Sequence, residues 1–216
     1  MNNNSKGFTL IELLAVITIM GILMMVAIPT VSRTIENSRK DTFIDMVKQY
    51  VSSVQNMWAA DNLECAGFVS SAVKSGAYYV EVNTMSDSVP QLLEQGGKSP
   101  WGNRDIIGII GVAVRMDGSS RKITYYPAFV DGIHGINVKP DGSGTVRVWK
   151  SADKLTRGDL VMSNARYGIL ATQSGSTWNV KSDMSFSVDL NDDGDKDDVV
   201  DGLAEANVLA VKCVER

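Results

Sequence analysis

The sequence predicts an α+β fold in which a long N-terminal helix, half of it embedded in a membrane, packs on an antiparallel β-sheet. Residues Phe8–Ile28 form an apolar run, and a helical pattern of apolar residues continues from there to about Ala60. From Leu63 onward, short β-like segments alternate with Gly, Asp, Asn and Pro. A chain of 216 residues has room for one globular domain besides such a helix.

The composition excludes several classes of protein. Apolar residues make up 44% and charged residues 21% of the chain, so wholesale disorder and collagen-like repeats are excluded. The net charge is −4, and much of the acidity lies in Asp183–Asp201. The sequence has no Lys/Arg-rich run of the nucleic-acid-binding kind, so nucleic acid is not indicated as a partner. One histidine and two cysteines are too few for a Cys/His zinc cluster.

The apolar run Phe8–Ile28 is long enough to cross a bilayer of about 30 Å as a helix. A secretory signal peptide is one alternative, although the run is long for one and ends without a small-residue cleavage pattern. A plain membrane anchor is another, although the run contains the charged residue Glu12. A carboxylate in lipid costs roughly 2.5–3.5 kcal/mol, so a plain anchor would be more stable without it. Glu12 favours a helix that leaves lipid and packs against copies of itself, where a cation neutralises the charge.

The residues around Glu12 resemble a known family. The segment Lys6-Gly-Phe-Thr-Leu-Ile-Glu-Leu-Leu14, followed by the apolar helix and Pro29, is similar to the leader and first helix of type IV pilins and pseudopilins. The resemblance implies that prepilin peptidase, a membrane-embedded aspartyl protease, cuts between Gly7 and Phe8 and methylates Phe8. It also implies that Glu12 pairs with the N-terminal amine of a neighbouring subunit during filament assembly.

The resemblance also divides the chain into regions. It implies a leader at residues 1–7, a long helix at 8–60 with a transmembrane part at 8–28, and a β-rich pilin head at 61–216. Pro29 removes a backbone donor, so it kinks or loosens the helix. It is either an ordinary break where the chain leaves lipid or, as the resemblance implies, part of a segment that melts in the filament. Beyond Pro29, an apolar stripe at intervals of three to four residues predicts a helix face that packs on the sheet. The stripe contains Ile35, Phe43/Ile44, Met46/Val47, Tyr50/Val51, Val54 and Met57/Trp58.

The head is expected to consist of sequential antiparallel strands. Asp117-Gly118 and Pro140-Asp141-Gly142 predict hairpin turns, and Val89–Glu94 predicts a short helix. Ser99-Pro-Trp-Gly-Asn103 resembles a turn of major pseudopilins and some Gram-positive pilins, with Trp101 available to fill the core. The expected strands are Ile106–Met116, Lys122–Val130, Gly132–Lys139, Gly144–Lys150, Tyr167–Thr172, Trp178–Val180, Ser185–Leu190 and Asn207–Val214.

An acidic segment near the C-terminus follows the pattern of a calcium-binding loop. Its oxygen donors stand at alternate positions around Gly194, which allows the bend. Val200 stands where such loops carry a bidentate glutamate, and the segment lies between two expected strands. A structural Ca²⁺ site is one interpretation, and a solvated acidic turn is the other. The resemblance supports the Ca²⁺ site, because some members of the pilin-like family bind calcium near the C-terminus. The candidate ligands are Asp189, Asn191, Asp193, Asp195 and Asp197.

The two cysteines, Cys65 and Cys213, belong to a chain that is expected to be exported, which suggests a disulfide. Two buried free thiols are the alternative. The resemblance favours the disulfide, because type IV pilins often carry one that reaches a C-terminal cysteine.

The sequence contains no recognisable catalytic constellation, so the protein is expected not to be an enzyme. His134 has no nucleophile motif near it and is expected on a turn or on the surface. The best interpretation is a structural subunit of a type IV pilus or related filament, which spans the bacterial cell membrane once and then joins other pilin subunits in a surface filament. The alternative is a minor, tip-located pilin whose large head binds a host surface, DNA or another ligand.

Overall fold

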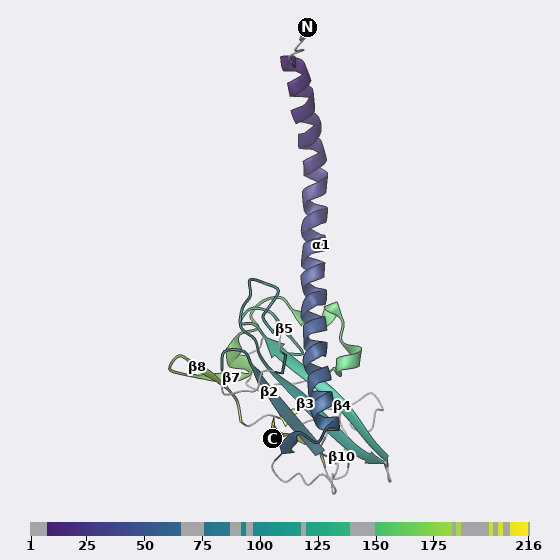
Figure 1. Cartoon of the computed structure of the whole chain (residues 1–216), viewed down its shortest axis with the longest axis vertical. Helices are drawn as coiled ribbons and strands as arrows, with labels where there is room; N and C mark the ends of the chain where they lie inside the picture. The colour runs from purple at the N-terminus through teal and green to yellow at the C-terminus, as the bar shows by residue number, and fades with distance from the viewer. Residues whose placement is uncertain are drawn as a thin grey trace, which may run out of the picture. The chain divides into compact units, whose positions relative to one another are not determined.

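The computed structural model describes most of the chain as two compact units, residues 1–40 and residues 41–216. Helix α1, Leu10–Ala59, contributes its first part to one unit and its second part to the other (Figure 1). The described residues are 8–65, 76–86, 92–93, 97–117, 120–138, 150–182, 185–186, 199–200, 203–204 and 208–215.

The first unit consists of the N-terminal part of α1. None of its described residues is buried within the chain, and the helix is long and apolar enough to cross a membrane. Pro29 lies inside α1, which continues through it, so the expected long helix is confirmed and the alternative of a break at Pro29 is wrong. The proline removes one backbone hydrogen bond, but helix formation is cooperative and the turns on both sides persist. Melting of this segment in a filament stays a prediction.

In the second unit, the remaining part of α1 buries one face against the β-sheet. The predicted stripe is confirmed over its central part, because its residues there are buried in a core shared with the strands. Ile35 is the exception: it lies in the first unit and is 49% exposed. The buried residues of α1 are Phe43, Ile44, Met46, Val47, Tyr50, Val51 and Val54.

The main sheet has seven strands in the order β1-β13-β2-β3-β4-β5-β6. Neighbouring strands are antiparallel except that β13 runs parallel to β2, so the expectation of a purely antiparallel sheet is wrong at this pair. The exception arises because the last strand of the chain enters between two early strands and can oppose only one of them. The strands are β1 Leu63–Cys65, β2 Gly76–Asn83, β3 Ile107–Asp117, β4 Ser120–Val130, β5 Gly135–Ile136, β6 Leu160–Val161 and β13 Val211–Glu215.

The central strands β2, β3 and β4 bury residues on both faces of the sheet. Val80, Ile110 and Phe129 face the α1 side, whereas Tyr79 and Ile109 face a second core. This second core is closed by residues that follow β5, including Val138, Ala165, Leu170 and Ala210. Strands that are buried on both faces are expected to be apolar at successive positions, as Ile109 and Ile110 of β3 are.

Several expected strands are shorter in the structure. Gly132–Lys139 contributes only β5, because the Asp131 carboxylate accepts the backbone N–H groups of Ile133 and His134 and turns the chain there. Tyr167–Thr172 begins with the 3₁₀ helix η3, Tyr167–Ile169, before β7. Further elements are η1 Ala152–Lys154, η2 Arg157–Asp159, the hairpin β7 Ala171–Ser174 with β8 Thr177–Val180, and the short pairs β9 Ser185–Phe186 with β12 Val208–Leu209 and β10 Val199–Val200 with β11 Leu203–Ala204.

Some predictions fall outside the described residues. These are the turn Pro140-Asp141-Gly142, Gly118 of the other turn, all of Gly144–Lys150 except its last residue, and most of Val89–Glu94. The hairpin that Asp117-Gly118 predicts is nevertheless visible from its strands, since Asp117 of β3 pairs with Ser120 of β4.

Candidate functional site

The charged end of the apolar helix is organised by Thr9 and Glu12. Oε2 of Glu12 lies 2.8 Å from the backbone nitrogen of Thr9 and 2.8 Å from its Oγ1, and both groups donate to it. The backbone N–H of Glu12 in turn donates to Oγ1 of Thr9 at 3.4 Å. This is a capping box, in which the residue before the helix and the third residue within it satisfy each other's polar groups. The positive end of the helix dipole adds further stabilisation for the carboxylate.

The second carboxylate oxygen of Glu12, Oε1, makes no hydrogen bond to any described residue. The Thr9-x-x-Glu12 pattern is readable in the sequence as a helix start, but Glu12 was expected to act only between subunits. Gly7 lies outside the described residues, and Phe8 is 91% exposed directly before Thr9. Glu12 therefore has one oxygen bound within its own chain and one that is available to another group.

The first unit exposes a continuous set of large apolar side chains. Phe8 through Ile28 includes many residues that are each at least half exposed, and Val31 and Ile35 extend the set. The hydroxyl of Thr18 donates to the carbonyl of Leu14 at 3.1 Å, so this polar group is satisfied within the helix. A surface of this kind is stable only in lipid or against other apolar helices.

The two cysteines form a disulfide between Cys65 and Cys213. They are directly opposite each other in the antiparallel pair β1–β13, and both are almost fully buried. The prediction of a disulfide is confirmed in the structure, and the alternative of two free thiols is excluded there.

A buried polar cluster holds the Ser99–Asn103 turn against the loop after β4. Oδ2 of Asp131 accepts the hydroxyl of Ser99 at 2.5 Å and lies 2.9 Å from Nδ1 of His134. The His134 ring stacks on Trp101 with 4.1 Å between centroids, and Trp101 also contacts Phe43 of α1. The prediction that Trp101 fills the core is confirmed, since it is only 8% exposed. His134 lies in the turn after β4, as one of its two expected positions, but it is not on the surface, because Asp131 and Trp101 enclose it.

This cluster does not have the geometry of an activated nucleophile. In such a site a histidine would accept the serine proton, whereas here the Ser99 hydroxyl donates to Asp131. Asp131 accepts bonds from four donor groups, which are Ser99 Oγ, the His134 ring and the backbone N–H groups of Ile133 and His134. Burial raises the pKa of Asp131, but these hydrogen bonds outweigh it and hold the pKa below its ordinary value. The arrangement stabilises the fold.

Acid is expected to destabilise the head through Asp131. Because the pKa of this carboxyl is lower in the folded than in the unfolded chain, its stabilisation is fully present above about pH 4 and is lost as the pH falls through the folded pKa. Asp131→Asn should lower the free energy of unfolding at pH 7 by about 2 kcal/mol. It should also flatten the decline in stability between pH 5 and pH 3, measured by urea unfolding. An equally steep decline in Asp131→Asn and in the exposed control Asp45→Asn would contradict this role.

The candidate calcium ligands Asp189, Asn191, Asp193, Asp195 and Asp197 all lie outside the described residues. Within the described part of the chain, no group of three or more His, Cys, Asp or Glu side chains could hold a metal ion.

An apolar, membrane-length helix with a capped carboxylate at its start, continuing into a helix that packs on a β-sheet, defines a pilin-type subunit. Residues 2–28 match the family described as "Prokaryotic N-terminal methylation motif". The chain is also 35% identical over 127 residues to "Type IV major pilin protein PilE" of Neisseria gonorrhoeae, an alignment that covers 55% of this chain and 73% of that protein. No solved structure gives a significant match. The chain belongs to the type IV pilin family and has its α+β fold.

Proposed function

We propose that the chain is a structural subunit of a type IV pilus or related surface filament and that it polymerises through α1 after cleavage between Gly7 and Phe8. The observation that carries the proposal is the capping box of Thr9 and Glu12 at the start of a helix whose apolar residues up to Ile35 are exposed in the described part of the chain. Lipid covers this surface before assembly, and the same helices of other subunits cover it afterwards. The family membership supports a structural role and favours one without enzymatic activity.

The capping box suggests how the Glu12 carboxylate is stabilised both in the membrane and in the assembled filament. In lipid, the bonds from Thr9 to Oε2 stabilise Glu12 within its own subunit. Cleavage after Gly7 leaves these bonds in place, since Phe8 and Thr9 both remain. In the filament, Oε1 of Glu12 forms an ion pair with the methylated N-terminal amine of Phe8 from a neighbouring subunit. The attraction between these two charges is strong in apolar surroundings. Prepilin peptidase creates this amine, so processing and assembly are chemically linked.

Intact-mass and N-terminal analysis of material sheared from cells tests this proposal. A chain that starts at Phe8 and is heavier by one methyl group would support processing followed by export into a filament. A chain that starts at Met1 and stays in membranes would contradict filament assembly. A start near Pro29 would identify a signal peptide instead.

A minor, tip-located role is the second candidate, and the size of the head favours it. The alignment to the Neisseria protein leaves 45% of this chain unmatched, so the chain carries much sequence beyond the shared region. The relative itself is described as a major pilin, which favours the abundant role. The abundance of the subunit in the same sheared material distinguishes the two roles, because a major subunit dominates it and a tip subunit is a trace component.

We also propose that the acidic segment around Gly194 binds a structural Ca²⁺ ion, on the basis of its pattern of alternating oxygen donors. Chelation should lower the melting temperature of the wild-type chain by about 5 °C, as expected for loss of a ligand that binds only the folded state. The double variant Asp189→Ala/Asp193→Ala should not respond to chelation. The matched variant Asp45→Ala/Asp153→Ala, which removes two exposed carboxylates elsewhere, should respond like the wild type. An unchanged melting temperature of the wild-type chain would identify a solvated turn.

A further inference from the structure

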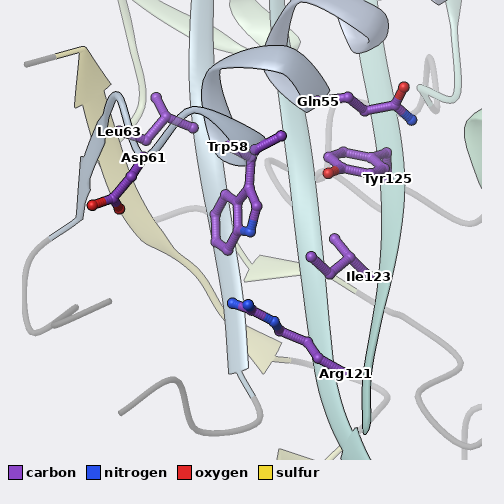
Figure 2. Close-up of a pocket in the computed structure, with 8 residues that line it drawn as sticks. Gln55, Trp58, Asp61, Leu63, Arg121, Ile123 and Tyr125 are labelled. Carbon is purple, nitrogen blue, oxygen red and sulfur yellow. The ribbon is translucent and has the colours of Figure 1, made fainter. Parts of the chain in front are cut away.

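A groove of about 440 Å³ lies between the C-terminal end of α1 and strand β4, within the second unit (Figure 2). Its volume lies in the range of sites that hold small organic ligands. The side chains of Trp58, Ile123 and Tyr125 form its apolar surface, and Arg121, Gln55 and Asp61 supply polar groups. The remaining lining residues are Ala59 and Leu63.

The end of α1 holds the groove in a defined shape. Asp61 has a φ of 57°, and the N–H of Asn62 donates to the carbonyl of Met57 at 2.9 Å. This pattern is a Schellman-type helix end, which satisfies carbonyls of the last turn. The Trp58 ring contacts that of Tyr78, with 5.7 Å between centroids. Trp58 is therefore held in place before any ligand arrives.

Two hydrogen-bond donors converge on the Trp58 indole from β4. Figure 2 shows the hydroxyl end of Tyr125 directed toward the indole and the Arg121 guanidinium approaching it from the other end of the groove. Among the described residues, neither side chain has a hydrogen-bond or ion-pair partner. Burial raises the pKa of Tyr125, although the nearby positive charge of Arg121 opposes the shift, so the hydroxyl stays protonated and can donate.

The chemistry of the groove selects among ligand classes. The half-buried indole of Trp58 lines the groove and suits the apolar face of a sugar ring. The planar groups of Arg121, Gln55 and Asp61 suit pairs of sugar hydroxyls. An unpaired guanidinium prefers a carboxylate, which it can bind in a bidentate manner. Of the side chains that the structure describes, Arg121 is the one cationic group that lines the groove, which disfavours phosphate-rich ligands such as nucleic acid, since these need several cations at one site. The polar side chains along the groove likewise disfavour a lipid tail.

We propose that this groove binds an acidic saccharide, with the sugar ring on Trp58 and its carboxylate on Arg121. This function goes beyond the structural role in a filament and would give each subunit, wherever it lies, a binding site for uronic-acid-containing glycans. A filament built from such subunits would carry the site many times along its length, so weak single contacts would add up to firm attachment.

The test measures binding of digalacturonate to the full-length chain in detergent by calorimetry and saturation-transfer NMR. Saturable binding is expected, with the strongest transfer to the protons on one face of the sugar ring. Arg121→Gln should weaken binding about tenfold, the effect of losing a charged hydrogen bond. Tyr125→Phe, which keeps the ring and removes the hydroxyl, should weaken it less.

Matched probes and a matched variant make the test specific. Lys122→Gln removes the same charge from the next position of β4, whose side chain faces the opposite side of the sheet, and should bind like the wild type. The neutral digalactose should bind about tenfold more weakly. The proposal is wrong if the wild type shows no saturable binding, if Arg121→Gln and Lys122→Gln behave alike, or if glutamyl-glutamate binds as tightly as digalacturonate. Loss of filaments in vivo would not affect this result, because the binding measurement uses unassembled chain.

Discussion

Glu12→Ala is expected to abolish filament assembly while cleavage after Gly7 continues. The variant removes both the bonds with Thr9 and the charge that is available through Oε1. In an apolar helix bundle, an N-terminal amine without its partner remains an uncompensated buried charge, which typically costs 3–5 kcal/mol. We therefore expect roughly a hundredfold less filament in sheared material, with processed subunit accumulating in the membrane.

Glu12→Gln separates the two roles of this residue. Glutamine is accepted at the third position of a capping box, so this variant keeps the helix start but not the charge. If pairing with the amine drives assembly, Glu12→Gln should fail as completely as Glu12→Ala. Normal filaments from Glu12→Gln would show that Glu12 acts only as a helix cap, and normal filaments from Glu12→Ala would contradict both roles.

Removal of the Cys65–Cys213 disulfide is expected to be the most destabilising change within the head. The bond closes a loop with a sequence separation of 148, for which chain entropy alone predicts about 5 kcal/mol. Domains of this size have a total stability of only about 5–15 kcal/mol. The double variant Cys65→Ser/Cys213→Ser should therefore unfold at a much lower denaturant concentration than the wild type, or not fold at 37 °C.

Reduction provides the control for this prediction. A reducing agent should lower the unfolding midpoint of the wild-type chain to that of the double variant and should leave the double variant unchanged. Equal midpoints for the oxidised wild type and the double variant would mean that strands β1 and β13 are held by hydrogen bonds and packing alone.

The parts of the fold that the sequence predicts well are those with strong local patterns. Helix α1 was predicted to within two residues at its start and one at its end, and β3 and β4 follow from alternating and continuous apolar residues around one turn. Strands β1 and β2 were missed, because β1 has only three residues and β2 carries polar Glu81 and Asn83 among its apolar ones. The parallel placement of β13 depends on a pairing between residues far apart in the chain, which no local pattern encodes.

The candidate sites also divide into those visible in the local sequence and those formed only by the fold. Glu12 and the cysteines stood out because a charge in an apolar run and a lone cysteine pair are visible without a fold. The cluster of Ser99, Asp131 and His134 did not, since Ser99 lies far from the other two in sequence and meets them only when the turn packs on the sheet. The groove at Trp58 was missed for the same reason, because Arg121, Ile123 and Tyr125 of β4 line it together with residues near the end of α1.

The position of β13 has a consequence for how the protein is made. A chain emerges from the ribosome N-terminus first, yet the strand that links β1 to the rest of the sheet consists of Val211–Glu215, far from β1 in the sequence. Until those residues arrive, β1 has no partner strand, β2 has a bare edge and Cys65 has no second thiol. The main sheet is therefore completed only after Val211–Glu215 have been synthesised, although β1 and β2 are made much earlier.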